Sequence, residues 1–135
     1  MAGYSGTPLE RKLGVKDGIT VFLDRAPAGF SLEADTVSRL PKSLELSLTF
    51  HIEAATLETR LPQLVDRTVP AGAIWVCWPK KSAVKAGLVD VGEVVVLDEN
   101  TVREIGLAAG VVDVKVAAID EVWSGLKFVR RLRDR

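Results

Sequence analysis

The stretch PAGAIWVCWPKK (residues 70–81) carries the clearest structural signal in the chain. A Pro-Ala-Gly turn leads into the apolar run from Ala73 to Trp78, which ends at a proline and two lysines. An unbroken apolar run, unlike an alternating one, is typical of a central strand covered on both faces. We therefore expect residues 73–78 to form a buried strand of a parallel sheet. Cys77 lies inside this run, so we expect a small buried side chain rather than an activated nucleophile.

Strand and helix patterns alternate on both sides of this run. The apolar patterns predict strands at residues 19–23, 44–52, 111–119 and 126–132. Helices are predicted at residues 8–13, 31–40, 55–69 and 98–109, with Asp98 capping the last one. Residues 44–52 alternate between apolar and polar side chains, which predicts one dry face and one wetter face that carries His51. Residues 93–97 could form a further short extended segment.

This order of elements predicts an α/β fold: a three-layer, Rossmann-like arrangement around a mostly parallel, five-stranded sheet. The turn at residues 120–125 is too short for a crossover, so the last strand must run antiparallel to the one before it. We expect the spatial order 19–23, 44–52, 73–78, 126–132 and 111–119, and we treat residues 1–135 as a single domain.

Charge and composition exclude several classes of protein. The chain has 18 basic and 18 acidic side chains, which argues against a dedicated nucleic-acid binder, because such proteins carry a basic excess. No stretch approaches the roughly 18 apolar residues of a membrane span. A single cysteine gives no disulfide framework and no cysteine-based metal site. These features predict a protein of the cytoplasm.

Residues 44–132 resemble the C-terminal half of a class I methyltransferase-like Rossmann domain. The segments that carry this resemblance are LPQLVDRTVPAGAIWVCWPK (61–80), TVREIGLAAGVVDVKVAAID (101–120) and GLKFVRRL (125–132). The resemblance implies that S-adenosylmethionine would bind at the first strand and its glycine-rich turn. Here LGVKDGITVFLDRAPAGF (13–30) offers Asp24 and Gly29, but Arg25, Ala26 and Pro27 stand where glycines are expected. Since those glycines allow close backbone approach to the ligand, we expect the cofactor to have been lost.

A second resemblance covers nearly the whole chain. YSGTPLERKLGVKDG (4–18), AIWVCWPKK (73–81) and VDVKVAAIDEVWSGLKFVRR (112–131) are similar to an uncharacterised bacterial family, the domain of unknown function numbered three thousand and fifty-two. That family has no established activity to carry over. The similarity does suggest that residues 1–14 pack across the domain or against a partner.

The carboxyl ends of the parallel strands form the edge where open α/β sheets bind ligands. A lysine pair can hold a phosphate or carboxylate, an imidazole can act as a base, and an indole can stack on a ring. Each of these groups also has an ordinary structural role, as a solvated strand end or a turn residue. The predicted edge collects eight candidate ligand-binding residues: Asp24, Arg25, His51, Glu53, Lys80, Lys81, Asp120 and Trp123.

These candidates include neither a phosphate-binding glycine loop nor a complete set of nucleophile, base and orienting group. We therefore predict a non-catalytic protein with no cofactor and no metal, which binds a protein partner or a small anionic ligand at this edge. One alternative is a degenerate methyltransferase-like enzyme that binds S-adenosylmethionine or a nucleotide. Another is a nucleic-acid-associated accessory protein that uses the basic tail, residues 127–135. Self-association stays open.

Overall fold

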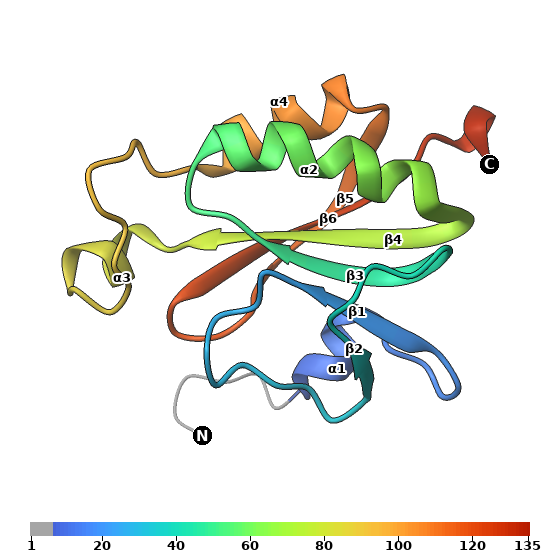
Figure 1. The fold of residues 1–135 in the computed structure, drawn as a ribbon, viewed down its shortest axis with the longest axis horizontal. Coiled ribbons are helices and arrows are strands. Elements are labelled where there is room, and N and C mark those ends of the chain that lie inside the picture. The colour runs from blue at the N-terminus through green and yellow to red at the C-terminus, as the bar shows by residue number, and fades with distance from the viewer. Residues whose placement is uncertain (1–6) are drawn as a thin grey trace.

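The computed structural model describes residues 7–135 and shows a mixed α/β fold (Figure 1). One sheet of six strands has the order β2-β1-β3-β4-β6-β5. Its strands are β1 (Thr20–Asp24), β2 (Asp35–Val37), β3 (Leu44–Phe50), β4 (Thr68–Pro79), β5 (Val111–Ala118) and β6 (Trp123–Arg130). The helices are α1 (Leu9–Leu13), α2 (Ala54–Arg67), α3 (Lys81–Lys85) and α4 (Glu99–Ala108), with a short 3-10 turn at Leu132–Asp134.

The pairing of the strands confirms the predicted mixed topology. Strand β1 runs parallel to β2 and β3, and β3 runs parallel to β4. Strand β6 lies between β4 and β5 and is antiparallel to both, so β5 runs in the same direction as β4. The carboxyl ends of β1, β3, β4 and β5 therefore meet at one edge of the sheet, next to α3 (Figure 1).

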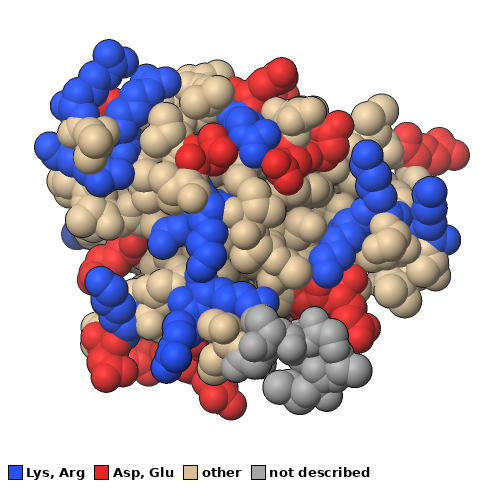
Figure 2. All heavy atoms as spheres, turned by 180° about the vertical axis from the view of Figure 1, so that it is seen from behind, with Lys and Arg blue, Asp and Glu red and all other residues tan. Residues whose placement is uncertain are grey.

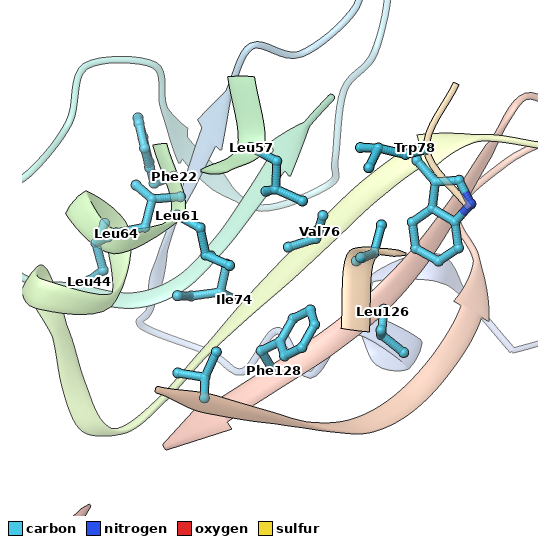
Figure 3. Packing of buried hydrophobic residues seen from close by; sticks show 13 residues of the cluster. Phe22, Leu44, Leu57, Leu61, Leu64, Ile74, Val76, Trp78, Leu126 and Phe128 are labelled. Atoms are coloured by element: carbon cyan, nitrogen blue, oxygen red, sulfur yellow. The ribbon is translucent and has the colours of Figure 1, made fainter. Parts of the chain in front are cut away.

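Helices α2 and α4 cover one face of the sheet. Leu57, Leu61 and Leu64 recur at helical spacing on α2 and are fully buried, because this spacing places them on one side of the helix. They pack on Ile74 and Val76 of β4 and extend toward Phe128 of β6 (Figure 3). Asp98 caps α4 as predicted, since its carboxylate accepts the backbone N–H of Thr101 at 2.8 Å.

The opposite face packs on α1 and the loops around it. Leu13 of α1 contacts a second buried cluster that includes Leu48, Trp75 and Cys77. Trp75 and Trp78 point to opposite faces of β4, and each belongs to one of the two clusters. Both of these tryptophans are thus core residues, and the expectation of a central strand buried on both faces is confirmed.

The structure corrects the expected elements in several places. Residues 31–40 do not form a helix; they contain β2, a three-residue edge strand, so the sheet has six strands rather than five. Strand β6 begins at Trp123 instead of residue 126 and ends at Arg130. No strand forms at residues 93–97, which lie in the loop between α3 and α4. Helix α1 starts at Leu9 rather than at residue 8, with Pro8 as its N-cap. The suggested packing of residues 1–6 lies outside the described residues.

Strand β3 departs from the expected pattern of one dry and one wetter face. Ser47, Thr49 and His51 are as fully buried as the leucines between them. The reason is that β3 is a central strand with α2 against its polar side, so these side chains are covered by the helix. The prediction of a solvated His51 at a strand end is therefore wrong.

Candidate functional site

The turn after β1 brings a strained arginine to the carboxyl edge of the sheet. Arg25 is the non-glycine residue with a positive φ angle, 60°, within the described residues 7–135. Such a left-handed conformation is costly for a residue with a Cβ atom and persists only where the surroundings hold it in place. Here the Nε–H of Arg25 donates to the backbone carbonyl of Phe50 at 3.1 Å, which ties the β1 turn to the end of β3. The two terminal nitrogens of the guanidinium lie at the carboxyl edge of the sheet.

Directly below this edge lies a buried chain of hydrogen bonds. The carboxylate of Asp24 accepts two bonds from Arg60 of α2, at 3.0 Å from Nε and 2.9 Å from the terminal nitrogen. It also accepts the hydroxyl of Thr49 at 2.7 Å. Thr49 Oγ1 in turn lies 2.6 Å from Nε2 of His51, and Nδ1 of His51 lies 2.8 Å from the hydroxyl oxygen of Thr56. The chain thus joins β1, β3 and α2.

The direction of these bonds fixes the tautomer of His51. Because the Thr49 hydroxyl gives its proton to Asp24, its oxygen can only accept from His51, so Nε2 carries the proton. In the neutral ring Nδ1 carries no proton, so it accepts from the Thr56 hydroxyl at 2.8 Å; the backbone carbonyl of Glu53, 3.2 Å from that hydroxyl oxygen, is the more distant of its two acceptors. The pKa of His51 is lowered from 6.5 to about 4, first by burial and then by the positive charge of Arg25, although Asp24 opposes this shift. His51 is neutral at pH 7.

The low pKa of His51 predicts an acid-sensitive fold. The pKa of His51 in the folded chain, about 4, lies below the ordinary value of 6.5. Between pH 4 and pH 6.5 His51 is therefore mostly protonated in the unfolded chain and mostly neutral in the folded chain. Stability should fall as pH drops below 6.5, by about 2 kcal/mol between pH 7 and pH 5 from this group. Urea unfolding at both pH values, alongside His51→Gln, checks this. The variant should lose clearly less stability over the same range; an equal loss in both proteins would contradict the assignment to His51.

An open cavity of about 430 Å³ lies at the same edge, above the buried chain. The ends of β1 and β3, the start of α2 and β6, and the loop after α3 all contribute to it. Its walls are mostly apolar, with one guanidinium and one carboxylate among them. The lining residues are Arg25, Pro27, Phe50, Ile52, Glu53, Thr56, Val89, Val91, Val94 and Trp123.

Three of the eight candidate residues line this cavity: Arg25, Glu53 and Trp123. Trp123 is buried and packs edge-on against Phe50, with ring centroids 5.2 Å apart. It therefore closes the hairpin and forms a wall of the cavity at the same time.

The other candidates lie outside its lining. Asp24 and His51 belong to the buried chain of hydrogen bonds beneath it. Asp120 accepts the backbone N–H groups of Val122 and Trp123, both at 2.8 Å, so it shapes the β5–β6 turn. Lys80 precedes α3 and is half-buried, and Lys81 is exposed as the first residue of that helix.

Several residues of the site were not among the sequence candidates. Thr49 shares the strand face of His51 two residues away, and Thr56 and Arg60 are one helical turn apart on α2; both spacings are visible in the sequence. Val89, Val91 and Val94 come from a loop whose path no pattern indicated. Asp24 and Arg25, with Thr56, Thr59, Arg60 and Gln63, also line a second open cavity of about 520 Å³ beside α2.

The remaining candidate chemistries have little support in the structure. Cys77 is fully buried, and burial followed by the charge of Asp120 raises its pKa well above the ordinary value, so it stays a thiol. Among residues 7–135, no cluster of histidine, cysteine or acidic side chains could hold a metal ion. None of the helices in this part of the chain is both long and apolar enough to cross a membrane.

The basic tail is more ordered than expected from its sequence. Arg130 donates to the backbone carbonyls of Val65 and Thr68 at 2.6 and 2.7 Å, and so caps the C-terminal end of α2. Arg131 reaches the carbonyl of Leu107 at 3.5 Å. Figure 2 shows basic side chains on the face seen from behind gathered in a band near the middle and in a group at one corner, with acidic side chains beside and between them.

The fold is similar to those of several solved structures, two of which are methyltransferases. Magnesium protoporphyrin IX methyltransferase (ChlM) from Synechocystis PCC 6803, with bound S-adenosylhomocysteine, is 12% identical with a TM-score of 0.50; the match covers 73% of this chain and 52% of that one. The O-methyltransferase NcsB1 from neocarzinostatin biosynthesis, in complex with S-adenosylhomocysteine, is 12% identical with a TM-score of 0.54, over 73% and 34%. LepI in complex with S-adenosylmethionine is 11% identical with a TM-score of 0.57, over 93% and 47%.

The chain thus spans about half the length of these neighbours or less. No family model matches it, so the resemblance to the uncharacterised bacterial family gains no support. No curated protein matches it either. The resemblance to a methyltransferase-like Rossmann domain is confirmed at the level of the fold.

These neighbours contradict two of our predictions. We expected a non-catalytic protein with no cofactor, but the matching structures include two methyltransferases and chains that hold S-adenosylmethionine or S-adenosylhomocysteine. The findings favour the alternative over the main prediction, because the fold is that of structures with bound S-adenosylmethionine or S-adenosylhomocysteine.

Proposed function

We propose that this chain is a methyltransferase-like protein that binds S-adenosylmethionine, or a related adenosine-containing ligand, in the cavity lined by Arg25, Glu53 and Trp123. The observation that carries the proposal is the position of this cavity. It lies at the carboxyl ends of β1 and β3, the edge where open α/β sheets bind their ligands. The ligands named for ChlM, NcsB1 and LepI support the choice of ligand class.

The side chains around the cavity fit such a ligand. S-adenosylmethionine combines a flat aromatic base with ribose hydroxyl groups, a sulfonium group, an ammonium group and a carboxylate. The Nε–H of Arg25 donates to the carbonyl of Phe50, and the terminal N–H groups of the guanidinium can donate to a ligand carboxylate. The carboxylate of Glu53 can accept from hydroxyl or ammonium groups, and Trp123, Ile52 and Val91 offer apolar surface to a base.

The turn after β1 replaces glycines with a different device. In the family that this chain resembles, glycines let the backbone approach the ligand closely. Here Arg25 takes a left-handed conformation at φ 60° and Gly29 another at 84°, so the chain still turns sharply after β1. The guanidinium of Arg25 thus lies at the turn where the family has glycines without side chains. We expect Arg25, rather than the backbone amides, to hold the anionic end of the ligand.

The residues beneath the cavity have a supporting role. The carboxylate of Asp24 accepts hydrogen bonds from Arg60 and Thr49, which fixes the start of the β1 turn. We therefore expect Arg25 and Glu53, rather than Asp24, to contact the ligand. The neutral His51 holds Thr56, which lines the cavity. When bound, S-adenosylmethionine supplies an electrophilic methyl group; the groups of this chain that face it serve to bind and orient.

Several further points are proposals of the same kind. The chain covers only part of its structural neighbours, so the methyl acceptor and the activity of the whole protein are not assigned. Membership of the uncharacterised bacterial family, a single-domain organisation and a cytoplasmic location stay predictions. A protein partner and self-association also remain untested.

Thermal unfolding with added ligand tests this function. At one hundred times its dissociation constant, S-adenosylmethionine or S-adenosylhomocysteine should stabilise the folded chain by roughly 2.7 kcal/mol. Arg25→Asn removes the cation but tolerates the left-handed backbone, and Glu53→Gln removes the anion. Each should weaken binding about tenfold or more, because charge-assisted hydrogen bonds contribute about 1.5–3 kcal/mol.

The matched control is Lys81→Gln, which removes a cation from the same edge but outside the cavity lining. It should bind like the parent protein. The proposal fails if neither ligand stabilises the chain, or if Arg25→Asn and Lys81→Gln weaken binding equally.

A further inference from the structure

The structure brings three lysines together on the face of the sheet that carries α1, far from the edge described above. Lys115 of β5 and Lys127 of β6 are direct partners across the two strands. Like charges opposite one another in an antiparallel pair are destabilising. Lys16, in the loop between α1 and β1, adds a third positive charge to this group. The sequence presents these residues far apart, so only the fold shows the cluster.

The cluster lacks the acids that usually accompany such a group. Among residues 7–135, every ion pair is made by an arginine, and none involves these three lysines. Lys115 donates to the backbone carbonyl of Lys12 at 3.0 Å, which satisfies one of its three protons. Burial, followed by the charges of Lys115 and Lys16, lowers the pKa of Lys127. The fold therefore holds a half-buried ammonium group against two like charges.

A cavity of about 320 Å³ lies beside these lysines, at the amino ends of β1, β3 and β4. Lys16 and Lys127 line it together with one acid, Glu45, which is exposed. The rest of the lining is uncharged and mostly apolar, with Leu13, Ile19, Leu46 and Val69 among it. The cavity thus has a cationic side and an apolar side.

Gly14 lies next to the ammonium group of Lys127. It ends α1 in a left-handed conformation with φ 85°, which favours glycine. A Cβ atom at this position would also stand 3.3 Å from Nζ of Lys127, closer than an ordinary contact. The end of α1 and the ammonium group of Lys127 are thus immediate neighbours.

We propose that Lys16, Lys115 and Lys127 form a binding site for the phosphate group of a small molecule. A phosphate monoester carries between one and two negative charges and three acceptor oxygens, so it can engage several ammonium groups at once. Lysines bind phosphate as point charges and need no planar geometry. The apolar side of the cavity suits the organic part of an ester. Without a ligand the three ammonium groups repel one another, and a bound phosphate would relieve this repulsion. Proteins tolerate such unfavourable charge pairs mainly at functional sites.

Calorimetric titration of the full chain with inorganic phosphate and with phenyl phosphate, at constant ionic strength, tests the site. Saturable binding of phenyl phosphate is expected. Lys127→Gln should weaken it about tenfold or more, and Lys115→Gln should weaken it as well. Lys81→Gln, at the far edge, should leave it unchanged. Tighter binding of phenyl phosphate than of inorganic phosphate would assign the site to an ester, and equal binding to free phosphate; both support a phosphate site.

A second measurement separates binding from folding. Lys127→Gln removes one of two opposed charges, so without ligand it should unfold at a temperature no lower than the parent protein. The nuclear magnetic resonance signal of the Lys127 Cε group should move on adding phenyl phosphate, and its pKa should rise. The proposal is overturned if neither phosphate compound binds saturably, or if Lys127→Gln, correctly folded, binds as well as the parent.

Discussion

Trp75→Ala should destabilise this protein by about 5 kcal/mol, which is the largest loss we expect from a single substitution. Trp75 is fully buried on β4, and its indole N–H donates to the backbone carbonyl of Leu13 at 3.0 Å. Truncation removes a large apolar side chain, leaves a cavity, and strips that carbonyl of its donor. Urea unfolding at pH 7 measures the change.

Trp75→Phe separates packing from the hydrogen bond. It keeps most of the apolar volume but has no N–H group, so we expect a loss of about 2 kcal/mol. A loss of unfolding free energy below about 2 kcal/mol for Trp75→Ala would contradict the role of Trp75 as the link between β4 and α1.

Gly106→Ala should destabilise the protein by about 3 kcal/mol, although glycine to alanine in a helix normally stabilises it by about 1 kcal/mol. Gly106 lies on the buried side of α4, against β6. A Cβ atom there would stand 2.1 Å from Cε1 and 2.5 Å from Cζ of Phe128, a rigid ring that is itself fully buried. The helix must therefore move away from the sheet. The free energy of unfolding in urea measures the effect.

Two further proteins sharpen this prediction. Leu107→Ala, at an exposed position next in the same helix, should change stability by about 0.5 kcal/mol or less. Gly106→Ala combined with Phe128→Leu should be less destabilised than the sum of the two single changes, because the smaller side chain gives the new methyl group room. Strict additivity would show that the ring is not the obstacle.

The central strands of the fold could be predicted from the sequence because buried strands consist mostly of apolar residues. The apolar run at residues 73–78 and the strong patterns at 111–119 and 126–132 fixed three strands and their relative directions. The edge strand β2 left no such record. Asp35, Thr36 and Val37 are all exposed, and a parallel edge strand of three residues is held mainly by backbone bonds to β1.

Polar residues in the core explain the main error about the site. On β3, the alternation of apolar and polar residues normally indicates one solvent-facing side. Here Thr49 and His51 are buried, because Asp24 and Thr56 supply hydrogen-bond partners that make burial tolerable. No local pattern shows where such partners from other elements will stand.

The location of the candidate site was predictable, but its composition was not. The parallel topology placed the edge correctly, and Arg25, Glu53 and Trp123 do line the cavity. Lys80 and Lys81 follow β4, where α3 begins, and Asp120 follows β5, where it accepts backbone N–H groups of the turn. The loss of the family's glycines suggested loss of the cofactor; what the sequence did not show is that a left-handed arginine takes their place at the turn.

Amide and indole resonances of the ¹⁵N-labelled chain, titrated with S-adenosylhomocysteine, test the proposed function most directly. The account predicts saturable shifts that centre on Arg25, Glu53 and the indole N–H of Trp123. The lysine cluster of Lys16, Lys115 and Lys127 should stay unchanged. Absence of saturable shifts at millimolar ligand, or shifts centred away from the carboxyl edge of β1 and β3, would contradict it.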